Sequence, residues 1–177
     1  TISHRGALNT IHAVNDKYQI SRDDRVLALS DLSFDLSVYD IFGMLCAGGT
    51  IIFPDQDRVK EPQYWQQLIT EHKITIWNSV PQLAELLIED WRPLHNSTIR
   101  LFLLSGDWIP VTLPKRLSEA CPLSTIISLG GATEGSIWSI WYQINQLHSE
   151  WSSIPYGVAM PNQQIYVLNH NLLHCPD

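Results

Sequence analysis

The sequence has few of the residues that build metal or disulfide sites. Its 177 residues include three cysteines, Cys46, Cys121 and Cys175, which lie far apart and form no C-x-x-C pair. The seven histidines show no H-E-x-x-H spacing. These absences argue against a zinc site and against a disulfide framework. Three separate thiols favour a reducing, cytoplasmic location.

Positive charge and long apolar runs are also scarce. Eleven Lys and Arg residues against 18 Asp and Glu give a net charge of -7, with no basic tract. We therefore expect neither a nucleic-acid partner nor an anionic membrane surface. No apolar run approaches the ~20 residues of a membrane span, so we expect no membrane partner. No G-x-G-x-x-G opens a predicted helix, which argues against a dinucleotide-binding dehydrogenase.

The composition and the two ends predict one piece of a larger domain. Hydrophobic residues make up 45% of the chain, enough for a single sizeable core. The chain opens on T-I-S-H-R-G and closes on H-C-P-D, and neither end resembles the polar linker of a natural domain boundary. We expect residues 1–177 to be an internal fragment.

Strands and helices alternate along the first 138 residues. Ser3 is expected to cap a helix that ends near Gln19. A second helix from Val38 is expected to turn Phe42 and Leu45 inward. Short buried strands are predicted at residues 25–30, 50–53, 74–77, 99–104 and 125–129. This alternation predicts an α/β fold, with a parallel sheet flanked by helices on both faces.

The pattern changes after Trp138. Short β-rich pieces, Ile140 to Ile144 and Gln164 to Leu168, are separated by turn residues. We therefore divide the chain into an alternating α/β core, residues 1–138, and the truncated start of a β-rich unit, residues 139–177.

A glycine-rich loop follows the last strand of the core. Residues 128–138 read S-L-G-G-A-T-E-G-S-I-W, with Thr133 and Glu134 side by side. Open α/β folds bind ligands at the carboxyl ends of their strands. A hydroxyl beside one carboxylate suits a phosphate oxygen and a Mg²⁺ ion. The alternative is an ordinary glycine-rich turn.

A second candidate residue is Asp35, which stands beside Phe34 just before the second helix. One interpretation is structural, because Asp35 or Ser37 could simply cap that helix. The other is that Asp35 holds an ammonium group, since a semi-buried carboxylate is costly unless it is paired.

Three motifs in order resemble the adenylation domains of nonribosomal peptide synthetases. They are S-F-D-L-S-V-Y-D-I-F-G with L-C-A-G-G-T, then L-G-G-A-T-E, then I-P-Y-G-V-A-M-P-N-Q-Q-I-Y-V-L-N. The resemblance covers essentially all of the chain. It implies that ATP and an amino acid give an aminoacyl-adenylate. The acyl group then passes to the phosphopantetheine thiol of a peptidyl carrier domain, beside condensation or cyclisation domains.

The resemblance also implies residue roles. Asp35 would bind the substrate ammonium, Thr133 the α-phosphate and Glu134 the Mg²⁺ ion, the last two being the catalytic residues. Nucleotide contacts would fall on Gly106, Ser128, Gly130 and Thr133. The positions that select the amino acid would be Asp35, Leu36, Tyr39, Asn78, Leu103, Ser105, Leu129, Ile137 and Trp138.

Read in order, these nine residues resemble the family's signature for L-cysteine. The apolar members would leave a small space in which Asn78 and Ser105 could contact a thiol. For each residue taken singly, core packing is the alternative, above all for Leu103 and Leu129.

The glycine-rich loop departs from the usual N-x-Y-G-P-T-E motif of the family. Gly130 stands where the family has an aromatic side chain that stacks on adenine, Ala132 replaces a proline, and Ser128 replaces an asparagine. The G-G-A-T-E form resembles a variant of cysteine-activating members. The phosphate loop and the catalytic lysine of the family would lie outside this chain, so we expect the fragment alone to be inactive.

Two other functions are compatible with the sequence. An acyl- or aryl-acid:CoA ligase of the same superfamily would share the fold, but its substrate would give Asp35 no ammonium partner. A non-catalytic α/β binding module is the other, because a fold alone never fixes function. The flanking coding sequence would distinguish these readings.

Overall fold

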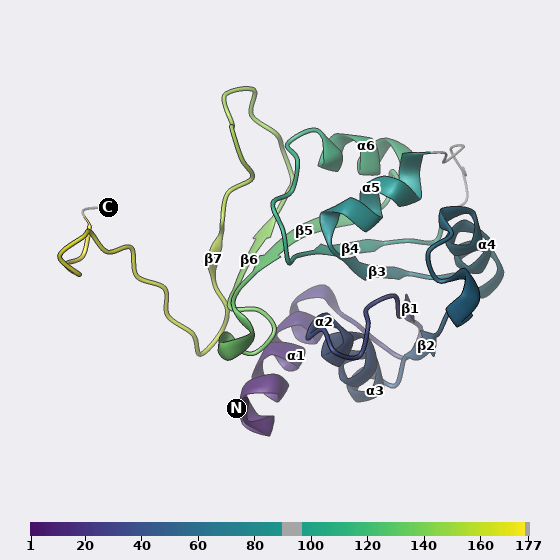
Figure 1. Ribbon diagram of the computed structural model, residues 1–177, viewed down its shortest axis with the longest axis horizontal. Helices are drawn as coiled ribbons and strands as arrows, with labels where there is room; N and C mark the ends of the chain where they lie inside the picture. The colour runs from purple at the N-terminus through teal and green to yellow at the C-terminus, as the bar shows by residue number, and fades with distance from the viewer. Residues whose placement is uncertain (90–96, 176–177) are drawn as a thin grey trace.

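The computed structural model describes residues 1–89 and 97–175, and its framework is a seven-stranded sheet with the order β2-β1-β3-β4-β5-β6-β7 (Figure 1). The first five strands pair with one another in parallel, whereas the β5–β6 and β6–β7 pairs are antiparallel. The predicted α/β fold with a parallel core is confirmed. The strands are β1 (Arg25–Leu27), β2 (Thr50–Ile52), β3 (Ile76–Ser79), β4 (Leu101–Leu104), β5 (Thr125–Gly130), β6 (Ile140–Gln143) and β7 (Val158–Ala159).

Helices cover both faces of the sheet, as the sequence predicts (Figure 1). One face packs against α4 (Pro62–His72), α5 (Pro81–Glu89) and α6 (Leu113–Ala120). The other packs against α1 (His4–Tyr18) and the segment of α2 (Leu36–Val38), η1 (Tyr39–Gly43) and α3 (Met44–Ala47). Two further short 3-10 turns are η2 (Gln56–Arg58) and η3 (Thr133–Gly135). Because strand side chains alternate between faces, Trp77 and Phe102 join the first core while Ile76 and Leu101 join the second.

Helix α1 begins and ends as its sequence predicts. The Ser3 side chain accepts a hydrogen bond from the Gly6 amide at 3.1 Å, so Ser3 is the N-cap. Gln19 adopts a left-handed conformation with φ 51° and ends the helix. No helix in the described part of the chain is long and apolar enough to cross a membrane.

The inward face of the second helical segment was predicted wrongly. Phe42 and Leu45 are 53% and 59% exposed, whereas Tyr39 and Met44 are fully buried. The segment passes from α-helix to a five-residue π-helix and back. Its sequence therefore offers two apolar faces, either of which could be buried. Asn15 accepts a hydrogen bond from the Tyr39 hydroxyl at 2.9 Å, and polar contacts of this kind decide which face is buried.

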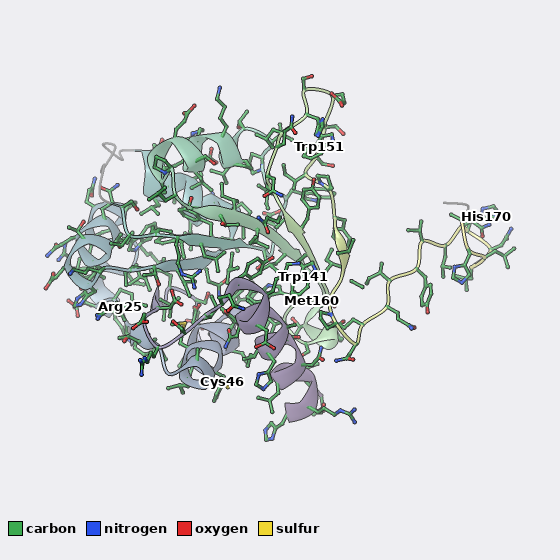
Figure 2. All side chains as sticks on the ribbon, turned by 180° about the vertical axis from the view of Figure 1, so that it is seen from behind. Arg25, Cys46, Trp141, Trp151, Met160 and His170 are labelled. Carbon is green, nitrogen blue, oxygen red and sulfur yellow. The ribbon has the colours of Figure 1, made fainter. Side chains whose placement is uncertain are left out.

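The strands after Trp138 differ from expectation. The sequence predicts a β-rich unit there, but β6 and β7 extend the same sheet, and Trp141 and Met160 join the core that contains α1 (Figure 2). Residues 164–168 form no strand. They belong to an extended segment that leaves the body and carries His170 near its far end (Figure 2). Apart from a single antiparallel bridge between Leu168 and His174, no strand of the described residues pairs with this segment, and its side chains are therefore largely exposed.

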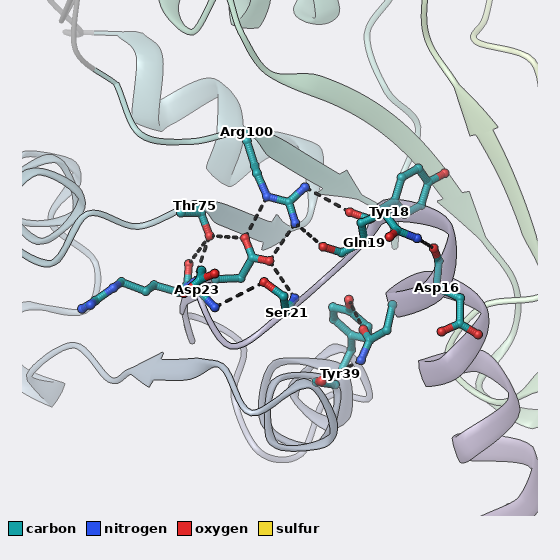
Figure 3. Close-up of polar contacts among 12 residues, drawn as sticks. Asp16, Tyr18, Gln19, Ser21, Asp23, Tyr39, Thr75 and Arg100 are labelled. Atoms are coloured by element: carbon teal, nitrogen blue, oxygen red, sulfur yellow. Dashed lines mark hydrogen bonds and ion pairs between the residues drawn. The ribbon is translucent and has the colours of Figure 1, made fainter.

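An ion pair lies at the amino-terminal ends of the strands, on the edge of the sheet away from the glycine-rich loop. Arg100 donates to both carboxylate oxygens of Asp24, at 2.8 and 2.7 Å, and Thr75 donates to the same carboxylate at 2.8 Å (Figure 3). Burial opposes ionisation of Asp24, but the hydrogen bonds from Arg100, Ser21 and Thr75 outweigh it and hold its pKa below the usual value. This network stabilises the sheet.

Candidate functional site

Polar residues at the carboxyl ends of the central strands meet at one edge of the sheet. Strand β4 lies between β3 and β5, and the register aligns Ser79 with Leu104 and Leu104 with Ser128. Asn78, Ser105 and Ser128 therefore reach the same carboxyl edge, where open α/β sheets bind ligands.

Asp35 and Thr133 are in direct contact at this edge. The Thr133 hydroxyl donates a hydrogen bond of 2.7 Å to a carboxylate oxygen of Asp35, across 98 residues of sequence. Asp35 directly precedes α2, yet its side chain makes no capping hydrogen bond. Asp35 therefore occupies the N-cap position without capping the helix through its side chain, and its half-buried carboxylate keeps capacity for a ligand.

Behind Asp35 lies a buried cluster that contains the remaining positions named by the resemblance. Leu36, Tyr39, Leu103, Leu129, Ile137 and Trp138 belong to one apolar core cluster, and Asn78 and Ser105 are buried as well. The sequence reasoning placed these residues near one sheet edge, and the structure brings them together.

Trp138 joins two parts of this cluster. Its indole nitrogen donates to the Ser105 hydroxyl at 2.9 Å, and its ring lies 5.0 Å from the Tyr39 ring in a tilted arrangement. Such an aromatic pair adds about 0.5–1.5 kcal/mol beyond burial. Ser105 thereby accepts a hydrogen bond from Trp138, and among the described residues no acceptor takes the proton of its hydroxyl.

Asn78 is oriented by Asp40, a residue that the sequence reasoning did not single out. The Asn78 amide nitrogen donates to a carboxylate oxygen of Asp40 at 2.8 Å and to the Leu36 carbonyl at 3.3 Å. Both donors are thus used, and the Asn78 side-chain oxygen is left without a hydrogen-bond partner among the described residues. A buried acceptor without a partner is costly, so this oxygen suits a donor on a ligand.

Burial has a strong effect on Asp40 itself. The side chain is fully buried, and this raises its pKa to about 7, although the hydrogen bond from Asn78 opposes the shift. The signal in the sequence is an acidic residue inside an apolar helical run, V-Y-D-I, which requires a buried partner.

A cavity of about 370 Å³ opens beside the ends of β4 and β5. Three of the predicted nucleotide-binding residues, Gly106, Ser128 and Gly130, line it. Gly106 has φ +84°, and a Cβ there would lie 3.3 Å from the Phe34 ring, so the turn after β4 favours glycine. Thr133, the fourth predicted contact, is not part of this wall and instead bonds Asp35.

Glu134 lies apart from this cavity. Its carboxylate is exposed and lines a groove beside α1 together with Arg5 and His12. The described residues contain no group of three or more His, Cys, Asp or Glu side chains that could hold a metal ion. Glu134 follows Thr133 in the sequence and offers one exposed carboxylate, which fits Mg²⁺ because this ion is usually held by one or two carboxylates together with substrate phosphates.

Comparison with known proteins gives a consistent result along the whole chain. The family model described as "AMP-binding enzyme" matches residues 1–177. Among curated relatives, the chain is 49% identical to the anguibactin system regulator of Vibrio anguillarum over 99% of its own length. It is 46% identical to pyochelin synthetase PchF of Pseudomonas aeruginosa, again over 99% of its length. The chain spans only 17% and 10% of these two relatives.

A solved structure gives the same picture. The nonribosomal peptide synthetase FmoA3, in a form with bound alpha-methyl-L-serine-AMP, matches 99% of this chain with a TM-score of 0.93 and 39% identity. The match covers 20% of the FmoA3 chain. The same protein has also been solved with bound AMPPNP.

Proposed function

The chain belongs to the AMP-binding enzyme family, and on that premise we propose that it is the amino-acid-selecting part of an adenylation domain in a nonribosomal peptide synthetase. The reaction is the ATP-dependent formation of an aminoacyl-adenylate, followed by transfer to a carrier phosphopantetheine thiol. The observation that carries the proposal is the hydrogen bond between Asp35 and Thr133 at the mouth of a buried cluster.

The first step is attack of the substrate carboxylate oxygen on the α-phosphorus of ATP, with pyrophosphate as leaving group. No covalent enzyme intermediate is needed, so the protein contributes alignment and compensation of charge. Asp35 would hold the α-ammonium, and once the ammonium replaces Thr133 as the partner of Asp35, the single proton of the Thr133 hydroxyl would be donated to the α-phosphate. Because these two side chains touch, the substrate's reacting end and the α-phosphate would be held side by side.

Mg²⁺, when bound, would neutralise phosphate charge, and Glu134 is the residue that we assign to hold it. Gly106, Ser128 and Gly130 would contact the nucleotide base region. In the second step the carrier thiol attacks the acyl carbon and AMP leaves. The carrier, condensation or cyclisation domains would belong to the same synthetase.

We further propose that the amino acid is L-cysteine. The cluster is largely apolar and packed, which favours a small side chain, and the Asn78 oxygen is an acceptor that no described residue satisfies. A thiol is small and carries one weak donor, so it satisfies both conditions. FmoA3 binds an adenylate of alpha-methyl-L-serine, whose side chain is also small and carries a donor.

The test is pyrophosphate exchange into ATP by the complete protein that carries this chain, with L-cysteine, L-serine, L-alanine and L-valine compared. We expect cysteine to give the highest kcat/KM. Serine is the closest competitor, because an apolar pocket separates such similar groups by only ~1–3 kcal/mol. A preference for a large or aromatic amino acid would reject cysteine, and exchange with aryl or acyl acids alone would favour the ligase alternative.

A further inference from the structure

Two exposed aromatic side chains stand on the wall of the cavity beside β4 and β5. Trp108 is 76% exposed and Tyr156 is 67% exposed, and both line the same hollow as Gly106 and Gly130. A concave surface that combines exposed aromatic rings with open glycine backbone is suited to a flat, aromatic ligand.

Ile140 and, beside it, Tyr156 lie where a side chain at position 130 would project. A Cβ placed on Gly130 would lie 2.8 Å from Cδ1 of Ile140 and 3.3 Å from Cε2 of Tyr156. The space beside Gly130 is therefore already filled by these two residues. A bulky residue could replace this glycine only if the Tyr156 ring or Ile140 moved.

We propose that Tyr156 provides the aromatic surface on which the adenine of ATP stacks, in place of the side chain that Gly130 lacks. This rests on the proposed function in one respect, that the nucleotide is ATP. The inference assigns a binding role to a residue outside the glycine-rich loop, in the turn that precedes β7.

The turn that carries Tyr156 is anchored on both sides, although its ring is exposed. Ile154, two residues earlier, is buried in the core that contains α4, α5 and α6. Gly157, one residue later, has φ +98°, and a Cβ there would lie 2.1 Å from the Trp141 carbonyl oxygen of β6. Close backbone packing against β6 thus holds the ring at the cavity wall. An aromatic ring on an anchored segment loses little conformational freedom when a base stacks on it.

Tyr156 is a stronger candidate for this role than Trp108. Both rings line the cavity, but only Tyr156 is among the atoms that a Cβ built on Gly130 would meet, and the missing side chain is at Gly130. The experiment therefore compares Tyr156→Ala, Tyr156→Phe and Trp108→Ala in the complete protein. Tyr166→Ala is a matched control, because Tyr166 is an exposed tyrosine in the C-terminal extension, outside the cavity.

The readout is equilibrium binding of ATP, measured by calorimetry without any amino acid. Tyr156→Ala should weaken ATP binding by about tenfold, because base stacking on an aromatic side chain is lost. Tyr156→Phe keeps the ring and should bind ATP like the wild type, as should Tyr166→Ala. Inorganic tripolyphosphate has no base, so every variant should bind it with the same affinity. This affinity is measured by competition with an ATP analogue. Melting curves check that each variant is folded.

Two results would overturn the role of Tyr156. One is unchanged ATP affinity in Tyr156→Ala, with or without a loss in Trp108→Ala. The other is an equal loss of ATP and tripolyphosphate affinity, which would mean that the substitution disturbs the site as a whole. Failure of the wild type to exchange pyrophosphate with any amino acid would instead reject the proposed function, and the ATP titrations would still decide whether Tyr156 binds the base.

Discussion

The hydroxyl of Thr133 donates a 2.7 Å hydrogen bond to the carboxylate of Asp35, although 98 residues separate them in sequence. The two residues come from different parts of the fold, the start of α2 and the loop after β5. Their contact links the proposed ammonium site to the proposed α-phosphate site. Four predictions test the chemistry that this arrangement implies.

Asp35→Ala should weaken L-cysteine activation by about 30-fold, or ~2 kcal/mol, because a half-buried ion pair with the substrate ammonium is lost. The des-amino analogue 3-mercaptopropionic acid brings no ammonium, so its disadvantage relative to cysteine should shrink. Pyrophosphate exchange with both compounds measures the ratio. Asp57→Ala, at an exposed carboxylate in η2, is the matched control. A cysteine-to-analogue ratio equal to that of the wild type would remove the ammonium role.

Glu134→Gln should lower the adenylation rate by at least about tenfold and raise the Mg²⁺ concentration that gives half of the maximal rate. The physical reason is that loss of one metal-binding carboxylate weakens neutralisation of phosphate charge in the transition state. The measurement is the exchange rate across a Mg²⁺ titration. Glu150→Gln, at another exposed carboxylate, is the control. If the titration curve does not move, Glu134 does not bind the metal.

Asn78→Leu should reduce the preference for L-cysteine over L-2-aminobutyrate, in which a methyl group replaces the thiol. The expected loss is about fivefold, the size of one weak hydrogen bond from the thiol to the Asn78 oxygen. The exchange assay with both amino acids measures the ratio. Asn145→Leu, at an exposed position, should leave it unchanged. An unaltered ratio in Asn78→Leu would mean that this oxygen accepts nothing from the substrate.

Asp40→Asn should change how stability depends on pH. Burial raises the folded-state pKa of Asp40 to about 7, so the folded state binds a proton more tightly than the unfolded state does. For a carboxyl group shifted upward, the stability is greatest at pH values below the unfolded pKa of ~3.9 and decreases as the pH rises toward 7.

The neutral asparagine can still accept the hydrogen bond from Asn78 and removes this dependence. The thermal midpoint of the wild-type protein should therefore fall more between pH 5 and pH 8 than that of Asp40→Asn. Equal falls in the two proteins would show that Asp40 does not carry the shifted pKa.

The sequence by itself predicted the layer architecture and the strands that lead to the site. Buried runs such as residues 101–104 and capping residues such as Ser3 are local signals, because strand burial and helix capping depend on neighbours a few residues away. The sequence also predicted that Asn78, Ser105 and Ser128 share one edge of the sheet, because each lies at or just after the carboxyl end of a parallel strand.

The tertiary structure alone decided the contacts between distant residues. The contact of Asp35 with Thr133, the orientation of Asn78 by Asp40 and the position of Tyr156 over Gly130 join segments separated by 98, 38 and 26 residues. The buried stripe of the second helical segment and the antiparallel addition of β6 and β7 also depended on partners far along the chain. Periodicity shows that a segment has an apolar face or can form a strand. Which residues pack on that face, or which strand pairs with it, is fixed only when the whole core packs.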